Sequence, residues 1–93
     1  MADRYDELGE ELLNLLRPGF GGRPAPEFVA RVRALANEML RIHSDGYVRQ
    51  KVLSMMEWVN KACSHRKHAP WGLRQVEEMA YSDAYRIANA RLD

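Results

Sequence analysis

Two helical patterns joined by a short stop-and-start signal constrain the fold of this chain more than any other feature. Between Ala34 and Ala62, apolar side chains recur at helical spacing on both sides of the segment His43–Gly46. The apolar residues before the signal are Phe28, Val32, Leu35, Met39 and Ile42, and those after it are Val48, Val52, Met55, Met56 and Val59. Ser44 or Asp45 is placed to cap the second helix, because both residue types favour the N-cap position. The sequence therefore predicts a helical hairpin with an apolar face on each helix.

Two further helical patterns flank this hairpin. Asp3 is a candidate N-cap for a first helix, and the apolar stripe behind it is Tyr5, Leu8, Leu12, Leu13, Leu15 and Leu16. The segment 17–24 interrupts that helix with prolines and glycines, and Phe20 within it is expected to plug the core. Pro26 suits the first position of the next helix. After Ala69-Pro70 a last stripe follows, formed by Leu73, Val76, Ala80, Ala84 and Ile87.

No segment shows the two-residue alternation of a half-buried strand between turn signals. We therefore predict an all-α fold, a compact bundle of four helices that forms a single domain over residues 1–93. The helices are expected over about residues 3–16, 26–43, 45–64 and 70–92. In so small a domain Met55 and Trp58 are expected to belong to the core.

Composition narrows the class of protein. Apolar residues make up 46% of the 93 residues and charged residues 29%, which is typical of a globular domain. No apolar run approaches the roughly 18 residues that a membrane helix needs, and acids open the chain where a signal peptide would be basic. The single cysteine, Cys63, cannot form an internal disulfide. We expect a cytoplasmic protein with no membrane partner.

Charge is unevenly distributed along the chain although the net charge is only +1. Residues 1–16 carry a net charge of −4, residues 17–56 a net charge of +4, residues 57–76 a net charge of +3, and the remainder −2. One interpretation is that the acidic first helix neutralises basic helices within the same domain. The other is that the basic surface meets an acidic partner, since charge asymmetry bears on association and not on fold.

The hairpin turn resembles a known repeat family. The run from Leu35 to Val59, with Ser44-Asp45-Gly46-Tyr47-Val48-Arg49 at the turn, resembles the helix pair of HEAT-type repeats. In those repeats an Asp opens the turn and a Val-Arg pair begins the second helix. The resemblance covers one unit, about a quarter of the chain. It implies a protein-binding surface and not a catalytic one.

One residue set has the side chains of a metal site. Cys63, His65 and His68, with His43 as a possible fourth ligand, combine the thiolate and imidazole groups that zinc favours. On a continuous helix, however, residues two apart point away from each other, which separates Cys63 from His65. We therefore predict no metal and no cofactor, with Cys63 in the core and both histidines in a solvated basic tail.

Catalysis is not expected either. The segment Gly19-Phe20-Gly21-Gly22 lacks the preceding strand and the lysine-hydroxyl pair of a phosphate-binding loop. Glu77 and Glu78 are adjacent, so their side chains diverge by about 100° on a helix and cannot act as a paired-carboxylate site.

A nucleic-acid interface is the alternative function. Phosphates require clustered cations, and a tryptophan face can stack on an unpaired base. The candidate residues are Lys61, His65, Arg66, Lys67, His68 and Arg74, with Trp71 among them. Four further residues would extend this patch if the two helices of the hairpin present the same side: Arg33, Arg41, Arg49 and Lys51. A helix-turn-helix interpretation would expose Arg49, Gln50, Lys51 and Ser54. The near-neutral pI of about 7.9 argues against a dedicated nucleic-acid-binding domain.

The favoured function is protein binding. Aromatic residues are enriched at interfaces, and Tyr81 and Tyr85 form an i, i+4 pair on the last helix. The candidate partner-binding residues are Trp71, Tyr81, Tyr85, Arg49 and Lys51. We expect a small non-enzymatic interaction protein, of the kind that acts as an adaptor, accessory or inhibitor of a larger bacterial or phage assembly. A homodimer through the first and fourth helices would use leftover apolar surface.

Overall fold

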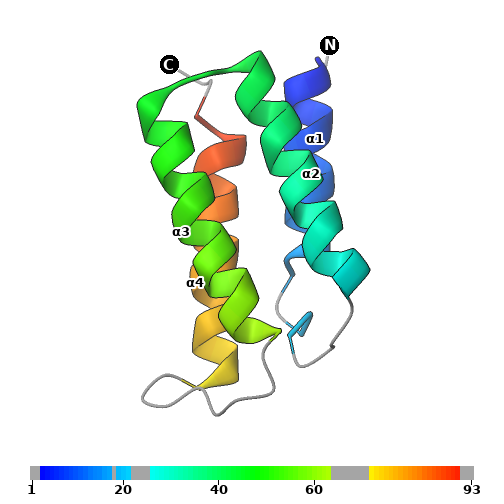
Figure 1. Cartoon of the computed structure of the whole chain (residues 1–93), viewed down its shortest axis with the longest axis vertical. Helices are drawn as coiled ribbons and strands as arrows, with labels where there is room; N and C mark the ends of the chain where they lie inside the picture. Colours follow the sequence, from blue (N-terminus) through cyan, green and yellow to red (C-terminus); the bar gives the residue numbers. More distant parts are fainter. Residues whose placement is uncertain (1–2, 18, 22–25, 64–71, 91–93) are drawn as a thin grey trace.

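The computed structural model describes residues 3–17, 19–21, 26–63 and 72–90. Within these residues the chain forms four α-helices and no strand, as predicted (Figure 1). The helices are α1 (Arg4–Leu15), α2 (Pro26–Ile42), α3 (Gly46–Ala62) and α4 (Leu73–Ala88). The third helix ends two residues earlier, and the fourth begins three residues later, than the periodicity predicts. No helix of the described part is long and apolar enough to cross a membrane.

Aspartates cap α1 and the second helix of the predicted hairpin, α3. The Asp3 carboxylate accepts a hydrogen bond of 2.9 Å from the backbone N–H of Asp6. The Asp45 carboxylate accepts one of 2.7 Å from the N–H of Tyr47, so Asp45 is the residue that caps α3. Each cap satisfies a backbone donor that has no partner within its helix.

The helices pack in a square in which each touches its two neighbours along the chain, and α4 closes the square against α1. Figure 1 shows α2 and α3 in one layer, with α1 and α4 in a second layer behind them. The most extensive contact joins α3 to α4, and the least extensive joins α2 to α3. The predicted hairpin is therefore present, but other described helices, and not further repeats, cover its apolar faces.

The core lies between the two layers and contains the predicted stripes. The fully buried side chains include Tyr5, Leu8, Leu12, Leu16, Val32, Met39, Val48, Met55, Val59, Val76 and Ile87. Phe20 is buried as predicted, and its ring stacks on Phe28 with 5.4 Å between the centroids. Trp58 packs against the core but is only partly buried. Ile42 departs from the predicted stripe and is 44% exposed, because it is the last residue of α2 and no helix covers it there.

Two close approaches explain why glycine occupies particular positions. A Cβ atom at Gly9 of α1 would lie 2.9 Å from the Cβ atom of Ala88, so glycine lets α1 and α4 pack closely. A Cβ atom at Gly21 would lie 2.9 Å from the carbonyl oxygen of Ala62, at the end of α3. The short segment 19–21 is therefore pressed against the end of the bundle.

Candidate functional site

The outer face of α4 is the first part of the candidate site. Helical periodicity places Tyr81 and Tyr85 on this face, and Arg86 lies at its edge. A shallow depression of about 530 Å³ runs along it, lined by Glu78, Tyr81, Ser82, Tyr85 and Arg86. Tyr85 is 56% exposed, whereas Tyr81 is partly buried against the core. The i, i+4 tyrosine pair predicted from sequence therefore forms one surface.

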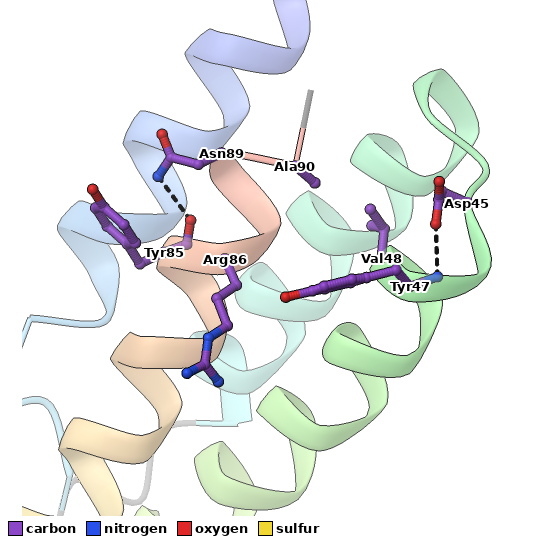
Figure 2. A pocket seen from close by; sticks show the side chains of 7 residues that line it. All are labelled: Asp45, Tyr47, Val48, Tyr85, Arg86, Asn89 and Ala90. Atoms are coloured by element: carbon purple, nitrogen blue, oxygen red, sulfur yellow. Dashed lines mark hydrogen bonds between the residues drawn. The ribbon is translucent and has the colours of Figure 1, made fainter. Parts of the chain in front are cut away.

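A second depression lies where the start of α3 meets the end of α4. It has a volume of about 360 Å³ and is lined by Asp45, Tyr47, Val48, Tyr85, Arg86, Asn89 and Ala90. In Figure 2 Tyr47 and Arg86 lie between the two helices, while Tyr85 projects from the other side of α4. Tyr85 and Arg86 line both depressions, which therefore adjoin. We call this combined surface the tyrosine groove.

Local hydrogen bonds hold the walls of the tyrosine groove. The Asp45 cap fixes the backbone at Tyr47, and the Asn89 amide donates a hydrogen bond of 2.8 Å to the carbonyl oxygen of Tyr85 (Figure 2). The ammonium nitrogen of Lys51 lies 5.6 Å from the centre of the Tyr47 ring, which is within cation–π range. The groove thus presents rigid aromatic walls with cationic groups beside them.

Beneath Arg86, a buried carboxylate joins the two helices that form the groove. Asp83 is 4% exposed and accepts a hydrogen bond of 2.6 Å from the Ser54 hydroxyl of α3. The guanidinium of Arg86 lies 3.9 Å from the same carboxylate. A buried charge is costly unless it is paired and hydrogen-bonded, and Asp83 has both kinds of partner.

The predicted partner-binding residues do not all meet at one place. Tyr81 and Tyr85 line the tyrosine groove, and Lys51 lies beside its Tyr47 wall. Arg49 is exposed but lies two residues from Tyr47 and Lys51, and so on a different face of α3. Trp71 lies outside the described residues.

The alternative nucleic-acid set is described only in part. The ammonium nitrogen of Lys61 lies 4.7 Å from the centre of the Trp58 ring. Arg74 forms an exposed ion pair of 3.2 Å with Glu78. The remaining residues of this set, His65, Arg66, Lys67 and His68, lie outside the described residues.

The helix-turn-helix interpretation, which predicts an exposed recognition face on α3, is wrong at one position. That interpretation needs Ser54 to be exposed beside Arg49 and Gln50. Instead Ser54 is partly buried and its hydroxyl donates a hydrogen bond to the Asp83 carboxylate, because that side of α3 packs against α4.

The metal ligand set is not assembled among the described residues, which contain no group of three or more potential ligands. His43 packs edge-on against Tyr5, with 5.8 Å between the ring centroids. Cys63 is the C-cap of α3 and is partly buried. Burial raises the pKa of the Cys63 thiol, and the nearby Glu77 carboxylate raises it further. The other two predicted ligands, His65 and His68, lie outside the described residues.

Glu77 has a structural role that sequence inspection did not find. It is 5% exposed, and its carboxylate accepts a hydrogen bond of 2.6 Å from the backbone N–H of Gly21. Glu78, its neighbour, is exposed and faces solvent. The two carboxylates therefore diverge as predicted, but one of them ties the segment 19–21 to α4.

The sequence analysis did not predict that Tyr47, Arg86 and Asn89 belong to one site. Helical spacing could have placed Asn89 on the same face of α4 as Tyr85, but it puts Arg86 about 100° away from Tyr85 toward a neighbouring face. Nothing local could have brought Tyr47 to them, because that requires the antiparallel register of α3 and α4.

Ion pairs between α1 and α2 bear on the charge asymmetry. Arg31 of α2 pairs with Glu11 of α1, and Arg4 of α1 forms a 2.8 Å pair with Glu38 of α2. The hydrogen bond from Arg4 lowers the pKa of Glu38, and this effect outweighs the opposing effect of burial. One acid of α1 is thus neutralised by α2, while Asp6, Glu7 and Glu10 remain exposed.

Comparison with known proteins gives no relative: the sequence matches no protein-family model, and no curated protein or solved structure matches it.

Proposed function

We propose that this chain is a non-enzymatic helical protein that binds another protein through the tyrosine groove. The observation that carries the proposal is the gathering of Tyr47, Tyr85 and Arg86 around two adjoining depressions. Tyrosine and arginine dominate the binding energy of many interfaces, and tyrosine offers a large contact area with little loss of side-chain entropy. The exposed half of Tyr85 supplies an anchor that a partner would bury.

The groove selects for a segment with both apolar and acidic groups. Val48 and Ala90 contribute apolar surface to its floor, while Arg86 and the nearby Lys51 contribute positive charge. The Asp83 carboxylate is buried and already hydrogen-bonded, so it presents little negative charge to a ligand. An amphipathic helix that carries a carboxylate next to apolar side chains would complement this surface.

A binding role also agrees with the use of the buried carboxylates. Asp83 and Glu77 both accept hydrogen bonds from groups of the protein itself, which is typical of structural and not of catalytic carboxylates. An adaptor or inhibitor of a larger bacterial or phage assembly in the cytoplasm would need no more than this surface.

A crosslinking experiment tests the proposal. A photo-crosslinking amino acid at position 85 should yield a discrete conjugate in cells, whereas the same amino acid at position 75, which is exposed on α4 outside both depressions, should not. The captured protein is then purified and titrated against the wild-type chain, Tyr85→Ala and the control Gln75→Ala. We expect Tyr85→Ala to weaken binding at least tenfold, as for an anchor residue worth about 1.4 kcal/mol or more. Equal affinity of both variants and the wild type would reject the groove as the binding site.

Nucleic-acid binding is the second candidate. The ammonium group of Lys61 over the Trp58 ring supports it. Proteins bind single-stranded nucleic acid with cations that contact the phosphates and aromatic rings that stack on the bases. Fluorescence anisotropy with labelled dT20 at 20 and 200 mM NaCl tests it. Phosphate contacts predict an affinity that falls steeply with salt, and no binding at low salt would exclude this function.

A further inference from the structure

Besides Arg31, which pairs with Glu11, the layer formed by α2 and α3 carries three exposed arginines: Arg33 and Arg41 on α2, and Arg49 on α3. None of the three guanidinium groups makes a hydrogen bond or an ion pair in the described part of the chain. The other arginines described there all have a polar partner. Arg4, Arg31, Arg74 and Arg86 each lie within 4.0 Å of a carboxylate, and Arg17 donates to Asn14.

These three arginines occupy one surface, which we call the arginine face. Eight residues separate Arg33 from Arg41, which is about 12 Å along a helix. The short turn at residues 43–45 brings the start of α3 back beside the end of α2, so Arg49 lies at the same end of the layer as Arg41. Leu53, one turn beyond Arg49 on the same side of α3, is 66% exposed. The face therefore combines unpaired positive charge with an uncovered apolar side chain.

The same chain presents a surface of opposite charge on α1. Its exposed side carries Asp6, Glu7 and Glu10, with the N-cap Asp3 one turn before them. Asp3 to Glu10 spans about 10 Å of helix, close to the spacing of Arg33 and Arg41. Leu13, one turn after Glu10, is only partly buried and continues this acidic stripe with an apolar group.

We propose that the arginine face of one copy binds the acidic stripe of α1 in a second copy. Charge complementarity and matched length support this occupant over a polyanion such as nucleic acid. A nearly neutral chain that displays its own acidic stripe attracts phosphates only weakly at long range. Leu13 also complements the exposed Leu53, to which a phosphate backbone offers no apolar contact.

The two surfaces are different, so the contact is head-to-tail. The arginine face belongs to the α2–α3 layer, whereas α1 belongs to the other layer (Figure 1). A contact between unlike surfaces leaves one of each free at the ends of a pair, and it therefore continues into rings or open chains. The tyrosine groove lies on α3 and α4 and takes no part in this contact, so the inference is independent of the proposed function.

Sedimentation velocity on the whole chain tests the inference. At 20 mM NaCl we expect the mass of the wild type to rise with concentration, and the association to weaken at least tenfold at 500 mM NaCl. The first variant, Arg33→Gln/Arg41→Gln/Arg49→Gln, loses the arginine face. The second variant, Asp6→Asn/Glu7→Gln/Glu10→Gln, loses the acidic stripe. Each variant alone should remain a monomer, with circular dichroism confirming that it folds.

Mixing the variants gives the decisive result. The first variant keeps an intact acidic stripe and the second keeps an intact arginine face, so an equimolar mixture should form 1:1 dimers that do not grow further. A control, Lys61→Gln/Arg74→Glu, changes the net charge of the wild type by the same three units but should still associate within threefold of it. A wild type that is monomeric at 20 mM NaCl, a mixture that stays monomeric, or binding of dT20 by the arginine face without self-association would overturn the inference.

Discussion

The hydrogen bond between Ser54 and Asp83 allows a quantitative test of how α3 and α4 are held together. The Ser54 hydroxyl donates to the buried Asp83 carboxylate over 2.6 Å. A hydrogen bond to a charged group contributes about 1.5–3 kcal/mol to the free energy of unfolding, and removing the donor leaves a buried charge with less solvation. The change Ser54→Ala should therefore cost about 2 kcal/mol, reduced by about 0.5 kcal/mol because alanine favours a helix. The net destabilisation is about 1.5 kcal/mol.

A double-mutant cycle separates this bond from other effects of the substitutions. Asp83→Ala removes the acceptor, together with the weaker 3.9 Å contact to Arg86. We expect a destabilisation of about 1.5 kcal/mol for each single variant, but only about 2 kcal/mol for the double variant, since the bond is lost once. The coupling free energy is then about 1 kcal/mol. Urea denaturation followed by circular dichroism measures all four proteins, and each single variant should lower the melting temperature by about 8 °C.

Ser82→Ala is the matched control, because Ser82 lines the outer depression on α4 next to Asp83. This control should change the free energy of unfolding by less than about 0.5 kcal/mol. A coupling free energy below about 0.3 kcal/mol would mean that the two residues act independently. That result would refute the argument that Asp83 holds α3 against α4.

Three further predictions concern the packing, an ion pair and the thiol. Gly9→Val should destabilise the fold by about 2 kcal/mol in urea denaturation, because its Cβ meets the facing alanine of α4, whereas Gly46→Ala enters open space and should not destabilise it. Because the pKa of Glu38 is lowered by folding, this carboxylate stabilises the fold at pH values above its pKa in the unfolded chain. That stability is lost as the pH falls through the pKa of Glu38 in the folded protein. Glu38→Gln should thus be less stable than wild type at pH 7, and this difference should vanish at pH 2. The raised pKa of Cys63 reduces its thiolate fraction, so a colourimetric disulfide reagent at pH 8 should react with it at least threefold faster in urea than in the folded protein.

The helices were predictable because their signals are local. Asp3 and Asp45 cap helices through a backbone N–H within three residues, so the residue types suffice to place them. The periodic stripe from Tyr5 to Leu16 identified the buried face of α1 in the same way. Phe20 was predictable for another reason, since a large apolar side chain in an otherwise polar loop has few alternatives to the core.

The candidate site was predictable only where it lies on one helix. Tyr81 and Tyr85 share a face of α4 by spacing alone. Tyr47 joins them through the register of α3 against α4, which no local pattern contains. The prediction that Ser54 is exposed beside Arg49 is wrong for the same reason, because no local pattern shows that this side of α3 packs against α4.

The two buried carboxylates explain why α4 presents its tyrosines outward. The apolar stripe of α4 contains small residues such as Ala80 and Ala84, which constrain helix rotation weakly because their short side chains interlock little. Glu77 and Asp83 point to different neighbours, the segment 19–21 and α3, and are six residues apart. A rotation of α4 by the 100° of one residue would break both hydrogen bonds and leave two charges buried without partners. These polar contacts therefore fix the orientation of α4 that the apolar packing leaves loosely defined, and with it the position of Tyr85 and Arg86 in the groove.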